Sequence, residues 1–319
     1  MRKTKPPIQL PAEQIKTFRY GKLEGRIAHF KYSGKSKSSE TFVVISGHHT
    51  SHERMASFAQ FLAGYGEVYA IDVPGFGGMG SFDRINKPID LDSYAEYLYT
   101  ILKTHKLNKN TSIFAVSLGG QIVTRMLQRY PESQSWLRRV VGFVTFAAGK
   151  DMHLSLPYKL AIQIPARIGS TKLGAKMIDV FVFNPVVLRG MLRIFSLFKK
   201  KMKASTAEFR KKSLQMEYFL WRVNDSRTQA KTTLMMLFGD LRRYSEELID
   251  VEMHNILTKH DQYVDEKEVN KTFRDLYRSY TPHYLELDVH MPSMIADKSE
   301  VAAMFDRQMI DAIMNPKES

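Results

Sequence analysis

The chain reads SIFAVSLGGQ from Ser112 to Gln121, a stretch that predicts a strand running directly into a helix. Its first residues are apolar, as in a buried strand, and the apolar residues that follow recur at helical spacing. Ser117 stands at the junction, with the small residues Ala115 and Gly119 two positions away on either side. Such a turn is sterically tight, and small neighbours relieve the clash while the serine hydroxyl is lifted above the sheet. We therefore predict that Ser117 is a nucleophile at a helix N-terminus, where backbone N–H groups favour an oxyanion.

Strand and helix patterns alternate on both sides of this junction. Strands separated by helix-length connections run parallel, so the sequence predicts an α/β fold with a mostly parallel central sheet and helices on both faces. The first 20 residues are polar and give no prediction. The predicted strands are Phe42–Ile45, Glu67–Val73, Thr111–Val116, Val140–Phe146, Val251–Leu257 and Tyr284–Val289, and the predicted helices are Met55–Ala63, Leu91–Leu107, Gly119–Tyr130, Glu266–Tyr280 and Ser299–Met314.

The alternation breaks near Lys150. From there to about Arg243 the sequence shows helical segments divided by prolines and glycines, with few strand signals. We predict an α/β core formed by residues 1–150 and 245–319, with residues 151–244 inserted between its two parts as helices.

Composition excludes several classes of protein. The 319 residues are 44% hydrophobic and 25% charged, which excludes a mainly disordered chain. There is no cysteine, so disulfides, thiolate metal sites, iron–sulfur ligation and a cysteine nucleophile are excluded. No apolar run reaches the length of about 18 residues that a membrane span needs, and no apolar signal-peptide segment follows the basic N-terminus. We expect a cytoplasmic protein, with peripheral membrane contact as an alternative.

Residues Ala115–Gly119 resemble the nucleophile elbow of the α/β-hydrolases, usually written G-x-S-x-G, with alanine in place of the first glycine. Two other segments are similar to motifs of that family. Ser46–His49 resembles the loop whose backbone N–H completes the oxyanion hole, with Ser46 where histidine is usual, and Asp72–Gly77 resembles the D-x-P-G-x-G turn that shapes the pocket wall. The resemblance implies a serine hydrolase whose inserted helices form a cap over the nucleophile.

The same resemblance assigns the remaining catalytic residues. Asp261 matches the acid that follows a late strand, and His290 matches the base that follows the last strand, so the chain order is Ser117, Asp261, His290. The oxyanion donors it implies are the backbone N–H groups of Leu118 and of His48, with His49 as the alternative to His48.

Other residues compete for these roles. Asp151, just after the fourth predicted strand, is the serious alternative acid, whereas Asp265 is expected to cap a helix. Among the histidines, His283 would lie at the wrong end of its strand, and His260 is expected to be pocket wall or solvated.

The grouped histidines His48, His49 and His52 suggest a metal, but only Glu53 offers a carboxylate nearby and no H-E-x-x-H pattern occurs. We expect no metal and no cofactor.

The positive charge is concentrated in the predicted insertion. The whole chain carries 47 Lys and Arg against 33 Asp and Glu, a net +14, and residues 151–250 supply 18 against 9. Nine basic residues fall between Arg189 and Lys212, interleaved with apolar ones. A cap helix with a solvated basic face, contact with an anionic membrane, and attraction of an anionic substrate all remain open. Nucleic acid is the weaker partner because no binding module is present.

The sequence therefore predicts an ester hydrolase of the carboxylesterase or lipase type, acting through an acyl-enzyme on Ser117. The substrate would be a small-molecule ester or a lipid with an apolar acyl group. Thioesterase, amidase, carbon–carbon hydrolase and acyltransferase chemistry stay open because they use the same triad, as does a non-catalytic member of the fold that only binds ligand.

Overall fold

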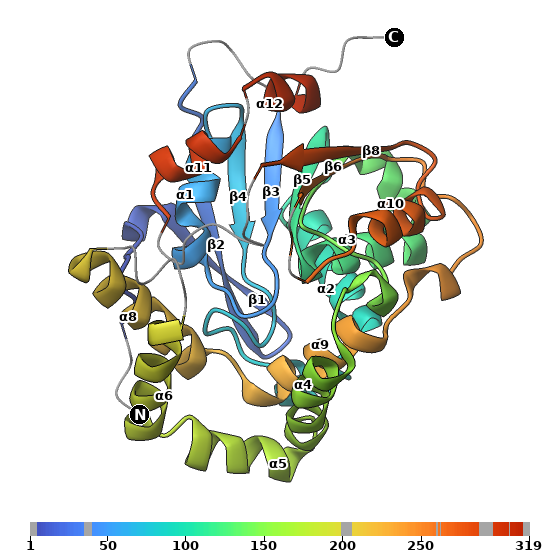
Figure 1. Cartoon of the computed structure of the whole chain (residues 1–319). Helices are drawn as coiled ribbons and strands as arrows, with labels where there is room; N and C mark the ends of the chain where they lie inside the picture. The colour runs from blue at the N-terminus through green and yellow to red at the C-terminus, as the bar shows by residue number, and fades with distance from the viewer. Residues whose placement is uncertain are drawn as a thin grey trace.

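In the computed structural model the described residues are 5–34, 40–198, 206–259, 261, 263–286, 296–305 and 307–314. They contain an eight-stranded sheet in the order β1-β2-β4-β3-β5-β6-β7-β8 (Figure 1). Strand β2 pairs antiparallel with β1 and β4, and the remaining pairings of this sheet are parallel. The strands are β1 Ile15–Tyr20, β2 Leu23–Phe30, β3 Thr41–Ile45, β4 Glu67–Ile71, β5 Thr111–Val116, β6 Leu137–Phe143, β7 Glu252–Thr258 and β8 Tyr280–Leu285.

Helices cover both faces of the sheet, which confirms the predicted fold class. Alternate residues of each central strand enter two apolar layers; in β5, for example, Ile113 and Ala115 join one and Phe114 and Val116 the other. The first layer is covered by α2 Leu91–Thr104, α3 Leu118–Arg129 and α10 Glu266–Arg274. The second is covered by α1 His52–Leu62, α11 Lys298–Met304 and α12 Arg307–Met314.

The antiparallel hairpin of β1 and β2 is absent from the predicted elements. Its turn uses Gly21 at a φ of 59°, a left-handed conformation that glycine adopts without strain. Only Phe18 of β1 is fully buried, so the strand lacks the regular apolar alternation that marks a half-buried strand.

The C-terminal part of the core also differs from prediction. Strand β8 begins at Tyr280, four residues before the predicted start, because Pro282 conceals the strand pattern and is tolerated at the sheet edge. The single predicted helix over residues 299–314 is two helices, since the chain becomes extended at Phe305 with φ −98° and ψ 121°.

The helices between β6 and β7 gather below the sheet in Figure 1, beyond the ends of its strands and not beside an edge strand. We call them the cap: α4 Leu156–Gly169, α5 Lys172–Met177, the π-helical turn η5 Ile178–Val182, α6 Pro185–Phe198, α8 Ala207–Val223 and α9 Ser226–Phe238.

The cap is fastened to the loop that follows β4. Asn224 accepts a hydrogen bond of 2.8 Å from the backbone N–H of Gly77, and the N–H of Asp225 donates to the carbonyl of Gly75 at 2.8 Å. Thr228 fills the space in which a side chain on Gly75 would lie, 2.4 Å from the added carbon. The loop and the turn between α8 and α9 therefore form a single packed unit.

Across the described residues, no helix combines the length and apolar character needed to cross a bilayer.

Candidate active site

Ser117 lies at the sharp turn between β5 and α3. Its φ is 49° and its ψ is −116°, a strained conformation for a residue with a side chain. The turn is fixed because the Ser117 N–H donates to the carbonyl of Phe143 at 3.0 Å and its own carbonyl accepts from Gly120 at 2.9 Å. The residue is half-buried, so it keeps part of its surface in contact with solvent.

The loop after β3 passes directly against this serine. A β-carbon added to Gly47 would lie 2.8 Å from the carbonyl oxygen of Val116 and 3.0 Å from Ser117 Cβ. His48, the next residue in the chain, is therefore directly bonded to a glycine that packs against Ser117. Leu118 is the first residue of α3, where a backbone N–H has no partner four residues earlier in the helix. These are the two N–H groups that the sequence predicts as oxyanion donors.

The His48 side chain joins this loop to the cap. Its Nε2 lies 3.2 Å from the carbonyl oxygen of Gln229 in α9, and because a carbonyl only accepts, Nε2 carries the proton. The ring packs edge-on against Phe76, with centroids 5.6 Å apart. Burial lowers the pKa of His48 to about 4, and the positive charges of His49 and Arg54 act in the same direction. His48 is therefore a neutral, structural imidazole at neutral pH.

The neighbouring His49 makes a second set of contacts with the cap. Its Nε2 lies 3.2 Å from Glu217 Oε2 in α8, and its Nδ1 lies 2.8 Å from Gln229 Oε1. The ring also packs on Trp221, with centroids 4.3 Å apart. At φ 54°, His49 has a left-handed backbone, and Arg54 donates to its carbonyl at 3.0 Å. The shape of the predicted oxyanion loop is thus set jointly by core and cap.

Asp261 lies just beyond the carboxyl end of β7, at the same end of the sheet as Ser117, which follows β5. One carboxylate oxygen accepts from the backbone N–H groups of Tyr263 at 2.7 Å and Val264 at 3.1 Å, and the other accepts from the Thr258 hydroxyl at 3.2 Å. These bonds fix the direction of the carboxylate. Strand β6 separates β5 from β7, which places the two strands about 10 Å apart, a gap that an imidazole can bridge.

Asp151, the alternative acid, is fully buried and engaged in holding the core together. One of its oxygens accepts from the N–H groups of Ala147 and Ala148 at 2.9 and 2.8 Å, and the other accepts from the Thr272 hydroxyl at 2.7 Å. Burial raises the pKa of Asp151, although these hydrogen bonds oppose the rise. Its contacts are those of a clamp between the loop after β6 and α10.

His290 and His260 lie outside the described residues, so the meeting of Ser117, Asp261 and His290 stays a prediction. Glu286, the residue after β8, is ion-paired with Lys259, two residues before Asp261, so the described chain places the end of β8 beside the segment that carries Asp261. His290 is four positions after Glu286, which an extended chain spans in at most about 14 Å.

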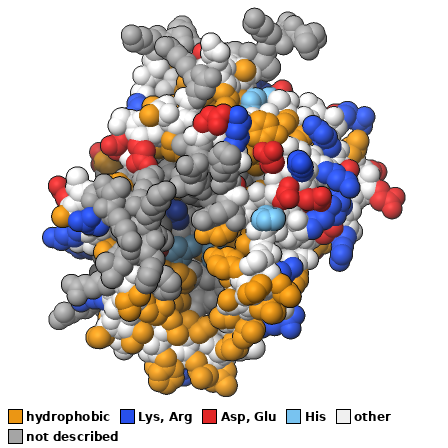
Figure 2. All heavy atoms as spheres, viewed as in Figure 1, with side chains coloured by type: hydrophobic (Ala, Val, Ile, Leu, Met, Phe, Trp, Pro, Cys, Tyr) orange, Lys and Arg blue, Asp and Glu red, His pale blue; other side chains and the backbone are white. Residues whose placement is uncertain are grey.

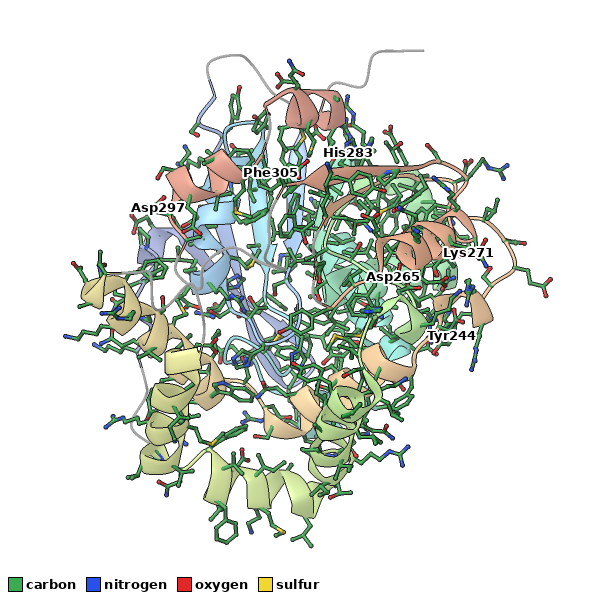
Figure 3. The ribbon with its side chains drawn as sticks, in the orientation of Figure 1. Tyr244, Asp265, Lys271, His283, Asp297 and Phe305 are labelled. Atoms are coloured by element: carbon green, nitrogen blue, oxygen red, sulfur yellow. The ribbon has the colours of Figure 1, made fainter. Side chains whose placement is uncertain are left out.

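The two remaining rivals, His283 and Asp265, are labelled in Figure 3. His283 is inside β8 and not at its start as predicted, and its Nε2 lies 3.0 Å from His254 Nδ1. Asp265 caps α10, accepting from the N–H groups of Lys267 and Glu268 at 2.9 and 3.2 Å.

The grouped histidines point to different partners. His52 binds Asp72, with 2.8 Å between Nε2 and Oδ1, whereas His48 and His49 contact the cap. Within the described ranges, no group of three or more His, Asp or Glu is placed to hold a metal ion.

Glu217, Trp221 and Gln229 were not predicted to take part in the site. They lie about 170 to 180 positions after the predicted oxyanion loop in the sequence, and α8 and α9 carry no motif that links them to it. Only the packing of the cap brings them together.

The sheet order and the serine at the turn after β5 define an α/β-hydrolase. A model of the family described as serine aminopeptidase, S33 (Hydrolase_4), matches residues 36–278, and the chain belongs to this family. The prediction of an α/β-hydrolase from the serine motif is therefore confirmed. No curated protein matches the sequence.

Solved structures share the fold at low sequence identity. An esterase from Exiguobacterium antarcticum is 15% identical with a TM-score of 0.61, over 91% of this chain and 96% of that one. An N-acyl homoserine lactonase, AidH, in complex with N-hexanoyl homoserine, is 16% identical with a TM-score of 0.63, over 96% and 98%. The epoxide hydrolase CorEH is 10% identical with a TM-score of 0.62, over 91% and 95%. Because different reactions occur on this fold, the likeness establishes the fold alone.

Proposed function

We propose that this protein is a serine hydrolase that cleaves carboxylic esters with an apolar acyl group, through an acyl-enzyme on Ser117. The observation that carries the proposal is the strained turn at Ser117, where Gly47 packs against Val116 and Ser117 and Gly119 packs against the backbone of Ile45. A serine with this backbone at the carboxyl edge of a parallel sheet is a nucleophile in position, and strain of this kind is retained where function requires it.

The proposed mechanism assigns one step to each residue. His290 removes the Ser117 proton as the hydroxyl oxygen attacks the ester carbonyl, and Asp261 orients the imidazole and stabilises its cation. The N–H groups of Leu118 and His48 bind the oxyanion. Collapse of this intermediate breaks the ester C–O bond, with His290 returning the proton to the leaving alcohol. Water activated by His290 then releases the acid from Ser117.

The preference for an apolar acyl group rests on the aromatic side chains beside the loop. The Trp221 ring packs on His49, and Phe183 also packs on Trp221, with ring centroids 4.8 Å apart. Phe76 lies on His48. Rings in this position disfavour a charged acyl group, which would lose its hydration on entering.

An ester is a better candidate than a peptide with a free amino terminus, although the family takes its description from aminopeptidases. A substrate ammonium group needs an available carboxylate. Glu217 is a cap carboxylate next to the predicted oxyanion loop; its Oε2 already lies 3.2 Å from His49 Nε2, and the charge of the Arg54 guanidinium acts on it. The opposing charges leave little attraction for a further cation.

A p-nitrophenyl ester series of increasing acyl length tests the function, with aminoacyl p-nitroanilides as the competing substrates. We expect ester turnover with a preference for medium or long acyl chains, and labelling of Ser117 by a fluorophosphonate. Ser117→Ala should remain folded by circular dichroism and lose both signals. Near-wild-type turnover by that variant, or selective cleavage of the anilides, would overturn the assignment.

A further inference from the structure

The outer side of the cap exposes apolar side chains to an unusual degree. Among the described residues, fifteen large hydrophobic side chains are exposed, and twelve of them lie between positions 156 and 194. Scattered exposed apolar residues are ordinary on a protein surface, but a contiguous group marks an interaction site. Figure 2 shows these side chains gathered at the end of the molecule formed by α4, α5 and α6. We call the exposed apolar and basic side chains of residues 156–194 the outer cap surface.

Helix α4 shows that the exposure is organised along the helix. Leu156, Leu160, Ile164 and Ile168 recur every fourth residue and are 69%, 43%, 57% and 53% exposed. Residues four apart lie on the same face of a helix, so α4 carries an apolar stripe on the side facing away from the protein. A surface helix normally turns such a stripe toward the core, and only Ala166 and Gly169 of α4 are buried.

The apolar side chains continue through the next two elements. Leu173 in α5 is 71% exposed, and Phe181 in the π-helical turn η5 is 66% exposed. A π-helical turn is uncommon and is found frequently at functional sites.

The charged residues of the outer cap surface are almost all basic. The sequence from 156 to 194 holds six Lys and Arg and one acidic residue, Asp179. Arg167, Lys172, Lys176 and Arg189 are exposed; Asp179 is exposed too, and it accepts a hydrogen bond from Ser226 in α9. The surface therefore combines large apolar groups with a positive field.

We propose that the outer cap surface binds an anionic lipid bilayer, with α4 to α6 lying in the interface. Apolar side chains enter the acyl boundary while neighbouring Lys and Arg contact acidic headgroups, which is the arrangement of a peripheral membrane surface. The cap helices do not cross the bilayer, in keeping with the absence of a membrane-spanning helix from the described part of the chain.

A bilayer fits this surface better than a second copy of the chain. In a two-fold dimer the same patch meets itself, which brings Lys172, Lys176 and their counterparts together with a single acidic residue from each copy to compensate. An anionic membrane satisfies both properties of the surface. The proposal is independent of the esterase assignment, because it requires no residue of the catalytic site.

Vesicle sedimentation of the Ser117→Ala protein tests the surface without any catalysis. We expect pelleting with vesicles of phosphatidylcholine and phosphatidylglycerol that weakens with salt, and much less with phosphatidylcholine alone. Leu173→Asp combined with Phe181→Asp should lower partitioning at least about tenfold. Lys172→Gln combined with Lys176→Gln should lower it about tenfold for the anionic vesicles. Leu248→Asp, a matched change at a side chain 41% exposed outside the cap, should change nothing.

Three results would overturn the proposal. One is a wild-type surface that fails to bind either vesicle. Another is unchanged binding by the Leu173→Asp, Phe181→Asp protein, which would place the contact elsewhere. The third is a wild-type dimer in sedimentation velocity that this double variant converts to a monomer, since the occupant would then be a second copy. Ester hydrolysis is measured separately on the wild-type protein. The hydrolase proposal and the membrane proposal can therefore fail independently of each other.

Discussion

Gly119 packs against the carbonyl oxygen of Ile45, so closely that an added β-carbon would lie 2.5 Å from that oxygen. The first turn of α3 is therefore held against the end of β3, the strand that precedes the predicted oxyanion loop. The position of the nucleophile relative to that loop depends on this contact between two backbones.

Gly119→Ala should disturb the site more than the fold. The methyl group meets backbone that cannot rotate away, so we expect a loss of about 1–3 kcal/mol in the free energy of unfolding. Displacement of Ser117 should lower kcat/KM about 100-fold on p-nitrophenyl esters. Urea denaturation and steady-state kinetics measure the two effects.

Gly190→Ala is the matched control. An added β-carbon there has no heavy atom within 4 Å, and the residue lies inside α6. Alanine should leave activity unchanged and raise stability by about 0.5–1 kcal/mol. Equal kinetic losses in both variants would mean that the crowding at Gly119 has no functional importance.

Variants of the two candidate acids should have different defects: the Asp261 variant should lose activity, and the Asp151 variant should lose stability. Asp261→Asn keeps an acceptor for the N–H groups of Tyr263 and Val264 but removes the negative charge, so kcat should fall about 10⁴-fold with little change in Tm. Asp151→Ala leaves the N–H groups of Ala147 and Ala148 without an acceptor, which should cost about 3 kcal/mol or more while kcat/KM stays near wild type.

Asp151→Asn serves as the control for the second variant. Its amide oxygen can accept from both N–H groups and its NH₂ can donate to the Thr272 hydroxyl, so most of the stability should return. A large fall in kcat for Asp151→Asn, together with an active Asp261→Asn protein, would transfer the acid role to Asp151.

Stability should decrease on mild acidification. Burial lowers the pKa values of His48 and His283 to about 4, below the usual value of about 6.5, and the nearby charge of His254 acts with burial on His283. Between these values the unfolded chain binds more protons than the folded chain. The free energy of unfolding should thus be at its full value above about pH 6.5 and fall progressively toward pH 4.

Urea denaturation at several pH values measures this slope, which His48→Gln and His283→Gln should each reduce. His153→Gln is the control, because that side chain is exposed in the folded protein as in the unfolded chain. A slope between pH 4 and 6.5 that neither variant reduces would show that other groups cause the acid sensitivity.

The sequence was most informative where local sterics and chemistry coincide. A serine between small residues, after an apolar strand and before a helix, has few alternative structures, and Ser117 adopts the predicted turn with a φ of 49°. The strand β5 has its predicted limits, Thr111–Val116, because every one of its residues is buried.

Features that depend on contacts between distant segments could not be predicted in this way. Nothing near His49 indicates that Glu217 and Gln229 from the cap hold its ring. The apolar residues of α4 are typical of a core helix, yet four of them face outward, because periodicity identifies a stripe and not the side that covers it. The edge strands were hard to predict for a related reason. Strand β1 has one buried side chain and β8 contains a proline, so neither shows the regular apolar alternation that identifies a strand.

The joint formed by Asn224 and Asp225 with Gly75 and Gly77 has a consequence for engineering and for evolutionary descent. If the cap of a relative replaced this cap, it would face a glycine loop whose shape fits Thr228. It would lose the contacts with that loop unless the relative's own loop were exchanged as well. The two segments, almost 150 positions apart, should accordingly be inherited as one module, and chimeras should be designed with both exchanged together.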